Sequence, residues 1–189
     1  ACLEIIYKNV NILIDPWLDG PAFNGAWIQY PPSVAMPKDL SPDILCLTHE
    51  HSDHFHENSF KQFDRSIPVY YPAFPNGRID KKLKAWGFVN LFPMQFGQEY
   101  EAFPKIKFTC YDPTSNWNDS IHLMDIDGYR ILNLNDAGVN FRIANLVKPV
   151  NLISSSYSTG ASGYPLCWTH LSDEETEKLL YNQFHAKIY

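Results

Sequence analysis

Hydrophobic positions along this chain fall into short runs separated by turn residues, which is typical of a fold built on β-sheets. Two β-branched runs, at 3–7 and 11–14, are separated by Lys8 and Asn9, so the pattern predicts an opening hairpin. The apolar run at 43–48 has the length and composition of a buried strand and leads directly into His49. Further strands are predicted at 68–71, 105–111, 121–126, 130–134 and 150–154, and helices at 57–63, 80–86, 141–147 and 173–184.

These strands and helices alternate along the chain, which indicates an α/β or α+β fold with a sheet core. With 189 residues and 45% hydrophobic content, the chain is long enough for one compact domain and hardly long enough for two. We therefore expect a single domain over 1–189. Because the sequence opens at Ala1 rather than Met and stops in 186–189, which resembles the start of a strand, we expect this domain to be open to extension at either end.

One long stretch, 15–42, is rich in proline, so regular structure is not expected there. Long loops in compact domains usually serve a function. Aromatic residues are interleaved with the prolines, and they are Trp17, Phe23, Trp27 and Tyr30. Two interpretations stay open: the rings form the wall or lid of a pocket, with Trp17 as a substrate contact, or they pack on the core.

Composition argues against several classes of protein. The net charge of -6 and the absence of clustered Lys and Arg argue against nucleic-acid binding. The four cysteines are widely spaced and Cys46 lies in an apolar run, so reduced thiols and a cytoplasmic location are expected. No apolar stretch approaches the roughly 18 residues that span a bilayer, so neither membrane insertion nor export is expected. No apolar stripe predicts a particular oligomeric state.

The segment 49–56 concentrates groups that bind metals, although the whole chain has only seven His. Residues two apart in an extended segment point the same way, so His49 and His51 share a direction. Asp53 and His54 follow where the chain turns toward a predicted helix. Imidazole and carboxylate suit zinc and non-haem iron alike. The pattern predicts a site for two metal ions, and the competing interpretation is a His-rich surface turn.

The pattern H-x-H-x-D-H behind a hydrophobic strand resembles the signature of the metallo-β-lactamase superfamily. This resemblance implies an αβ/βα sandwich, with two mixed sheets flanked by helices and one or two metals at its edge. It implies that His49 and His51 bind the first metal, and that Asp53 and His54 bind the second. His56 falls outside the motif and is not expected to be a ligand.

The superfamily also takes ligands from later loops. The resemblance implies that Asp136, just behind a predicted strand, bridges the metals. Asp119 stands where many members carry a His; a carboxylate there favours iron or manganese, and the alternative is an exposed loop Asp. His122 is expected to be a core or edge residue. His170 is the predicted last ligand, with His185 as the other late candidate. The expected cofactors are two divalent ions, zinc first, with iron or manganese as alternatives.

Several segments, in order from about residue 12 to 165, together resemble a narrower branch, the CMP-N-acetylneuraminate hydroxylases. They are 14–23 with its Asp-Pro-Trp, the Pro31-Pro32-Ser33 step, 48–54, Asp119, 133–136 and 159–165. In that branch the metallo-β-lactamase-like part is coupled to a Rieske iron–sulphur domain that supplies electrons for a hydroxylation. The paired Cys-x-His and Cys-x-x-His spacing of such a cluster is absent from this sequence, which weighs against the oxygenase activity.

The serine- and glycine-rich stretch 154–163 can expose backbone N–H groups toward an anionic group. We predict that a small anionic substrate contacts Ser158, Gly160, Ser162 and Gly163. A flexible turn between a strand and a helix explains the composition equally well. No elbow or triad pattern points to a serine nucleophile.

Hydrolysis is the first expectation for the chemistry. Two metals would lower the pKa of a water that attacks an ester, lactone or phosphoester, and Glu50 or Asp53 would orient the water or accept its proton. The alternative is an iron-dependent hydroxylation of a sugar nucleotide or similar molecule, with electrons from a partner. A third possibility from a different class is a metal-binding scaffold without turnover.

Overall fold

The computed structural model describes residues 2–113, 118–137, 141–155, 178 and 187–188. The chain divides into two compact units, residues 1–95 and 96–189. Each unit has a sheet of its own, with five strands in the first and six in the second. Within the described ranges, no helix is both long and apolar enough to cross a membrane.

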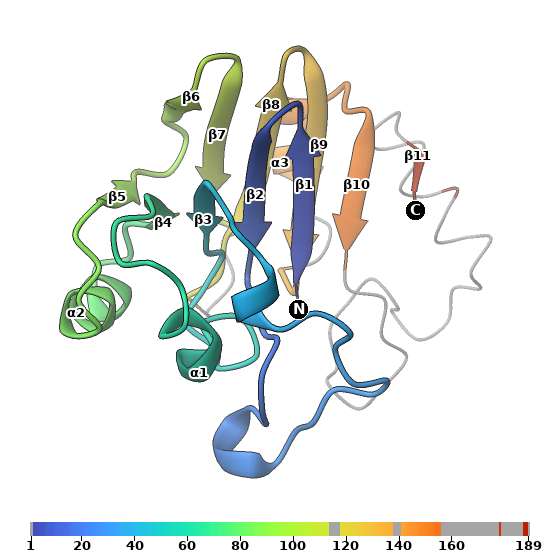
Figure 1. Ribbon diagram of the computed structural model, residues 1–189. Coiled ribbons are helices and arrows are strands. Elements are labelled where there is room, and N and C mark those ends of the chain that lie inside the picture. The colour runs from blue at the N-terminus through green and yellow to red at the C-terminus, as the bar shows by residue number, and fades with distance from the viewer. Residues whose placement is uncertain (1, 114–117, 138–140, 156–177, 179–186, 189) are drawn as a thin grey trace. The chain divides into compact units, whose positions relative to one another are not determined.

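The sheet of the first unit has the strand order β1-β2-β3-β4-β5 (Figure 1). β1 (Leu3–Tyr7) and β2 (Val10–Ile14) form the predicted antiparallel hairpin. β3 (Ile44–Cys46), β4 (Val69–Pro72) and β5 (Leu91–Met94) then add in parallel. Because parallel strands end at the same edge of a sheet, the segments that follow β2, β3 and β4 emerge together.

Two helices of the first unit pack on its sheet, and they are α1 (Glu57–Phe60) and α2 (Arg78–Ala85). Their apolar side chains join those of the strands in one buried cluster, because an amphipathic helix must bury its apolar stripe against another element. The members of this cluster include Leu13, Leu45, Val69 and Tyr71 from the strands and Phe60, Ile79 and Leu83 from the helices.

The loop between β2 and β3 contains no α-helix or ladder strand, as its proline content predicts. Its only regular pieces are two single 3-10 turns, η1 (Phe23–Gly25) and η2 (Pro37–Asp39), and an isolated bridge between Ala22 and Trp27. In Figure 1 the η1 end of this blue loop projects beyond α1.

The sheet of the second unit has the order β11-β10-β9-β8-β7-β6. The antiparallel part consists of β6 (Glu99–Phe103), β7 (Ile106–Tyr111), β8 (Ile121–Ile126) and β9 (Tyr129–Asn135). β10 (Leu152–Ser155) pairs parallel with β9, and β11 (Lys187–Ile188) pairs parallel with β10. α3 (Phe141–Val147) packs through Ile143, Ala144 and Val147 against Leu132 and Leu134.

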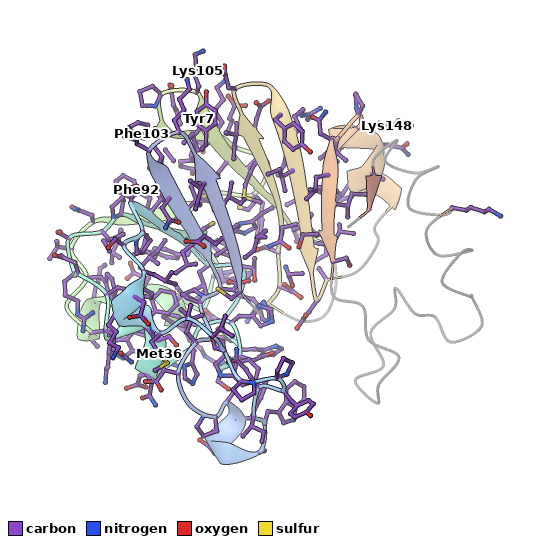
Figure 2. The ribbon with its side chains drawn as sticks, turned by 45° about the vertical axis from the view of Figure 1, so that its right-hand side comes forward. Tyr7, Met36, Phe92, Phe103, Lys105 and Lys148 are labelled. Carbon is purple, nitrogen blue, oxygen red and sulfur yellow. The ribbon has the colours of Figure 1, made fainter. Side chains whose placement is uncertain are left out.

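Two strands escaped prediction. β5 contains Pro93, which a central strand rarely tolerates, but β5 is the last strand of its sheet, where a missing N–H is harmless. Its Phe92 stacks on Tyr70 with ring centroids 4.7 Å apart, and Figure 2 labels Phe92 at this edge. β6 is also an edge strand. Its residues alternate between exposed and half-buried, so it lacks the apolar run that marks a central strand. The helix predicted at 173–184 lies outside the described residues, apart from Lys178.

Candidate metal centre

The predicted ligand turn begins three residues after β3, at the edge where the parallel strands of the first unit end. Backbone bonds close it tightly: the N–H groups of His54 and Phe55 both donate to the carbonyl of His51, at 3.0 and 2.7 Å. His49, Asp53 and His54 are buried, and His51 is half-buried. The strand and the turn therefore hold the four predicted ligands of this unit together.

The donor atoms of these four residues converge. His49 Nε2 lies 2.9 Å from His51 Nδ1, and His54 Nε2 lies 3.5 Å from Asp53 Oδ2. The rings of His49 and His54 have centroids 4.0 Å apart. Two nitrogens that each sit about 2.1 Å from one ion, at a right angle, are about 3 Å apart. The spacing and the chemistry of these donors therefore fit metal ions of the kind that imidazole and carboxylate bind.

Asp15 supports this turn from behind. Its carboxylate accepts hydrogen bonds from Thr48 N at 2.8 Å, Thr48 Oγ1 at 2.6 Å and His54 Nδ1 at 3.0 Å. Full burial opposes ionisation of Asp15, but the charges and hydrogen bonds of His54 outweigh it together with smaller contributions from His49 and Thr48, and they hold its pKa at about 2. Asp15 is therefore an ionised carboxylate that orients the imidazole of His54.

These bonds also fix the ring tautomers. His54 Nδ1 donates to Asp15, so the neutral form of His54 presents a lone pair at Nε2. Thr48 Oγ1 donates its proton to Asp15, so the same oxygen must accept the hydrogen bond from His49 Nδ1 at 3.0 Å. The proton of neutral His49 is therefore on Nδ1, and its Nε2 carries a lone pair. In these tautomers both imidazoles can bind a cation through Nε2.

Asp15 was not predicted as a site residue. Two signals were available: it directly follows the apolar strand β2, and its φ is positive at 47°, which a non-glycine residue adopts at some energetic cost. Only the second requires the structure. The pairing of β2 with β3 brings Asp15 to Thr48, 33 positions later in the chain.

His56, which lies outside the motif, has a different task. Ser59 Oγ accepts the N–H groups of Leu18 at 2.9 Å and Asp19 at 3.3 Å, so its own proton is left for His56 Nδ1 at 3.0 Å. His56 Nε2 then donates to the carbonyl of Pro21 at 3.2 Å. Buried His56 therefore links the start of the loop between β2 and β3, which we call the aromatic loop, to α1 through hydrogen bonds.

Glu50 turns toward α2. Its carboxylate forms an ion pair with Arg78 Nη1 at 3.1 Å and lies 3.5 Å from Asn76 Nδ2. The Glu50 side chain is half-buried, and that of Arg78 is exposed. The catalytic role predicted for Glu50 stays a prediction, and so does that of Asp53.

The aromatic loop divides into enclosed and open rings. Trp17 is buried, and its Nε1 donates to the carbonyl of Gly20 at 2.8 Å, so the packing interpretation describes this ring. Its substrate contact stays a prediction. Phe23 and Trp27 are partly exposed instead, and the Phe23 ring centroid lies 6.2 Å from that of His51.

The second unit gathers its two predicted ligands at one edge of its sheet. Asp119 lies just before β8 and Asp136 directly after β9, and antiparallel pairing places the start of one strand beside the end of the other. Asn135 Nδ2 donates to the carbonyl of Ser120, and Asn135 Oδ1 accepts the N–H of Asp136. Asp119 is buried, so the alternative of an exposed loop Asp was wrong.

His122 is buried in β8, as expected of a core histidine, with Nε2 at 2.8 Å from Ser120 Oγ. The other predicted site residues lie outside the described part of the chain, and they are Ser158, Gly160, Ser162, Gly163 and His170. The same holds for His185.

Residues 1–149 match the family described as the beta-lactamase superfamily domain. The chain belongs to this family. Its fold class is confirmed with it: two mixed sheets with few helices, as in the metallo-β-lactamase superfamily. The superfamily contains enzymes, and divalent metals are its characteristic cofactors, which agrees with the donor set at 49–54.

Relatives of this beta-lactamase superfamily chain include the cytidine monophosphate-N-acetylneuraminic acid hydroxylase of Mus musculus, 28% identical over 180 residues. That match covers 89% of this chain and 30% of the relative, so the chain spans about a third of the length of the curated protein it matches.

Solved structures with the same fold include CmlA, a diiron beta-hydroxylase from Streptomyces venezuelae, with a TM-score of 0.58 and 16% identity over 80% of this chain and 32% of CmlA. A possible metal-dependent hydrolase from Veillonella parvula has a TM-score of 0.62 and 18% identity over 80% of this chain and 66% of the hydrolase. At these identities the two likenesses show the fold of the chain and not its reaction.

Proposed function

We propose that this chain is the catalytic part of an iron-dependent hydroxylase that acts on a sugar nucleotide or similar anionic molecule, with electrons from a partner. The observation that carries the proposal is the 180-residue match, over 89% of the chain, to a protein named as a hydroxylase. Because the chain spans 30% of that relative, the missing iron–sulphur signature no longer weighs against hydroxylation. We therefore rank hydroxylation above the hydrolysis that the sequence favoured first.

In this proposal His49 and His51 hold one ion, and Asp53 and His54 hold the other. Asp119 and Asp136 stay the predicted ligands of the second unit. When bound, iron would supply Lewis acidity and one-electron chemistry with O2. The buried carboxylate of Asp119 favours a hard cation such as iron or manganese over zinc.

The chain's own residues prepare the centre. Asp15 and Thr48 hold the imidazoles of His54 and His49 through their Nδ1 atoms, which leaves Nε2 as the atom that would bind a metal. Glu50 is held in place by Arg78, and we propose that it accepts a proton from a polar group of the substrate.

The test begins with metal content. The chain is purified without O2 from cells supplied with iron and zinc, and its metals are counted by inductively coupled plasma mass spectrometry. We expect iron in the wild type and in Asp119→Glu, which keeps the carboxylate, and a shift toward zinc in Asp119→His. O2 uptake is then measured with a chemical reductant and a cytidine monophosphate-linked sugar acid. Zinc in the wild type with no O2 uptake would refute the hydroxylase.

A second candidate is the metal-dependent hydrolase. The observation that favours it is the imidazole-rich donor set of the first unit, with three histidines beside one aspartate, which suits zinc. It predicts two zinc ions and cleavage of ester, lactone or phosphoester probes without O2. A wild type that binds metal but shows neither activity would leave the metal-binding scaffold, and a wild type that retains no metal would refute all three candidates.

A further inference from the structure

The tip of the loop between β2 and β3 is a closed and firmly held unit. Ala22 N donates to the carbonyl of Trp27 at 2.9 Å, and Trp27 N donates back to that of Ala22 at 3.2 Å. Phe23 N donates to Ser52 Oγ at 2.7 Å, which ties the tip to the ligand turn itself. The segment 22–27 is therefore a built part of the site.

Two aromatic rings stand on this tip. The ring centroids of Phe23 and Trp27 are 4.7 Å apart, and the ring planes are inclined at 60°. The Phe23 ring also lies near His51, with ring centroids 6.2 Å apart. The exposed fractions are 36% for Phe23 and 49% for Trp27. Apolar surface that stays in water does not contribute the roughly 25 cal/mol of stabilisation for each Å² that its burial would give.

The backbone of the tip is also strained. Phe23 has a positive φ of 49°, a left-handed conformation that is unfavourable for a bulky residue, whereas Asn24 with φ 54° is of a type that adopts it readily. Strain and exposed aromatic surface together are typical of a segment that is kept for binding.

We propose that Phe23 and Trp27 form a platform that stacks a flat ring of the substrate beside the metal ligand His51. An aromatic face matches a flat unsaturated ring better than a flexible chain, because stacking uses the whole face of both partners. Of the two rings, Phe23 lies nearer to the predicted metal centre, with its centroid 6.2 Å from that of His51, and Trp27 extends the aromatic surface outward from it. This inference rests on the proposed function and narrows its substrate to molecules with a nucleobase-like ring.

The experiment compares two probes on the metal-loaded chain by isothermal titration calorimetry: cytidine 5′-monophosphate, and ribose 5-phosphate, which lacks the ring. We expect the wild type to bind the nucleotide about tenfold more tightly, since stacking on one aromatic side chain contributes roughly 1–3 kcal/mol. Trp27→Ala should abolish the preference and Trp27→Phe should keep part of it. Ile28→Ala removes an exposed apolar side chain one residue away and serves as the matched control.

Equal binding of the two probes, no binding of either at millimolar concentration, or an unchanged preference in Trp27→Ala would overturn the platform. So would an equal loss in Ile28→Ala, which would indicate a general apolar contact such as a protein surface. Metal content, measured on each sample, separates this from the function: a platform that fails on an iron-loaded chain leaves the hydroxylase standing, whereas a wild type without metal refutes the hydroxylase whatever the probes do.

Discussion

The two units of this chain assemble their predicted metal ligands in different ways. In the first unit, four donors come from one continuous turn, 49–54, behind a parallel strand. In the second, Asp119 and Asp136 are 17 positions apart and meet at one edge because β8 and β9 pair antiparallel. The first arrangement is local and depends on a supporting carboxylate, while the second is non-local and depends on sheet register.

Because of this difference, different substitutions should disrupt the predicted ligands of each unit. The turn at 49–54 fails if its supporting hydrogen bonds are lost, even though all its ligands remain. The edge at Asp119 and Asp136 fails if the contact between the ends of β8 and β9 is lost.

The largest expected effect is that of His51→Ala. Removing a donor 2.9 Å from His49 Nε2 should weaken metal binding by more than roughly 100-fold, beyond the loss of a supporting group. Metal content after dialysis against a chelator measures it. Glu57→Gln changes an acidic residue on α1 and should keep the wild-type metal content. Full metal retention in His51→Ala would remove this residue from the ligand set.

Asp15→Asn tests the supporting carboxylate. Oδ1 accepts from Thr48 N, and Oδ2 accepts from Thr48 Oγ1 and His54 Nδ1. An amide nitrogen at either position cannot accept, so at least one of these bonds is lost and the negative charge with it, and metal affinity should fall roughly 10–100-fold although every ligand is present. The matched control is Asp43→Asn, whose carboxylate accepts from Asn11 N just before β3 begins. Titration with a competing chelator measures both. Equal affinity in the two variants would contradict the role assigned to Asp15.

Asn135→Ala tests the edge of the second unit. It removes the side-chain bonds to Ser120 O and from Asp136 N, and it places alanine at a φ of 38°, so unfolding free energy should drop by roughly 1–3 kcal/mol. Urea unfolding followed by circular dichroism measures the change.

Asn135→Gly separates the two causes, because glycine accepts the positive φ but makes no side-chain bond. If its stability equals that of the wild type, the hydrogen bonds of Asn135 contribute nothing.

The smallest effect belongs to Asp80→Asn in α2, away from both sets of donors. The hydrogen bond from Lys84 lowers the pKa of Asp80, with a further contribution from Tyr71. A lowered folded-state pKa gives stability that is present above pH about 4 and is lost as the pH falls through the folded value. The variant should therefore lose roughly 0.3–0.5 kcal/mol at pH 7 and nothing at pH 2, measured by thermal unfolding. Equal losses at both pH values would contradict the ionic origin.

The continuous parts of the site were predictable because their information is local. The strand into His49 and the spacing of His51, Asp53 and His54 are visible as a hydrophobic run followed by polar donors. The opening hairpin and the irregular loop at 15–42 were confirmed for the same reason, since turn residues and prolines act on their own neighbours. The metal ligation itself and the roles of Asp53 and Glu50 stay predictions.

The superfamily, the sheet-rich fold class and the turn at 49–54 could be predicted from local patterns in the sequence. The structure was needed to show that Asp15 accepts a hydrogen bond from His54 and that His56 binds the carbonyl of Pro21. It was also needed to show that Trp17 is buried and that Phe23 lies partly exposed near His51. The physical reason is range: propensity and spacing act over a few residues, whereas these contacts join segments some 30 positions apart or more, which strand pairing and loop docking alone bring together.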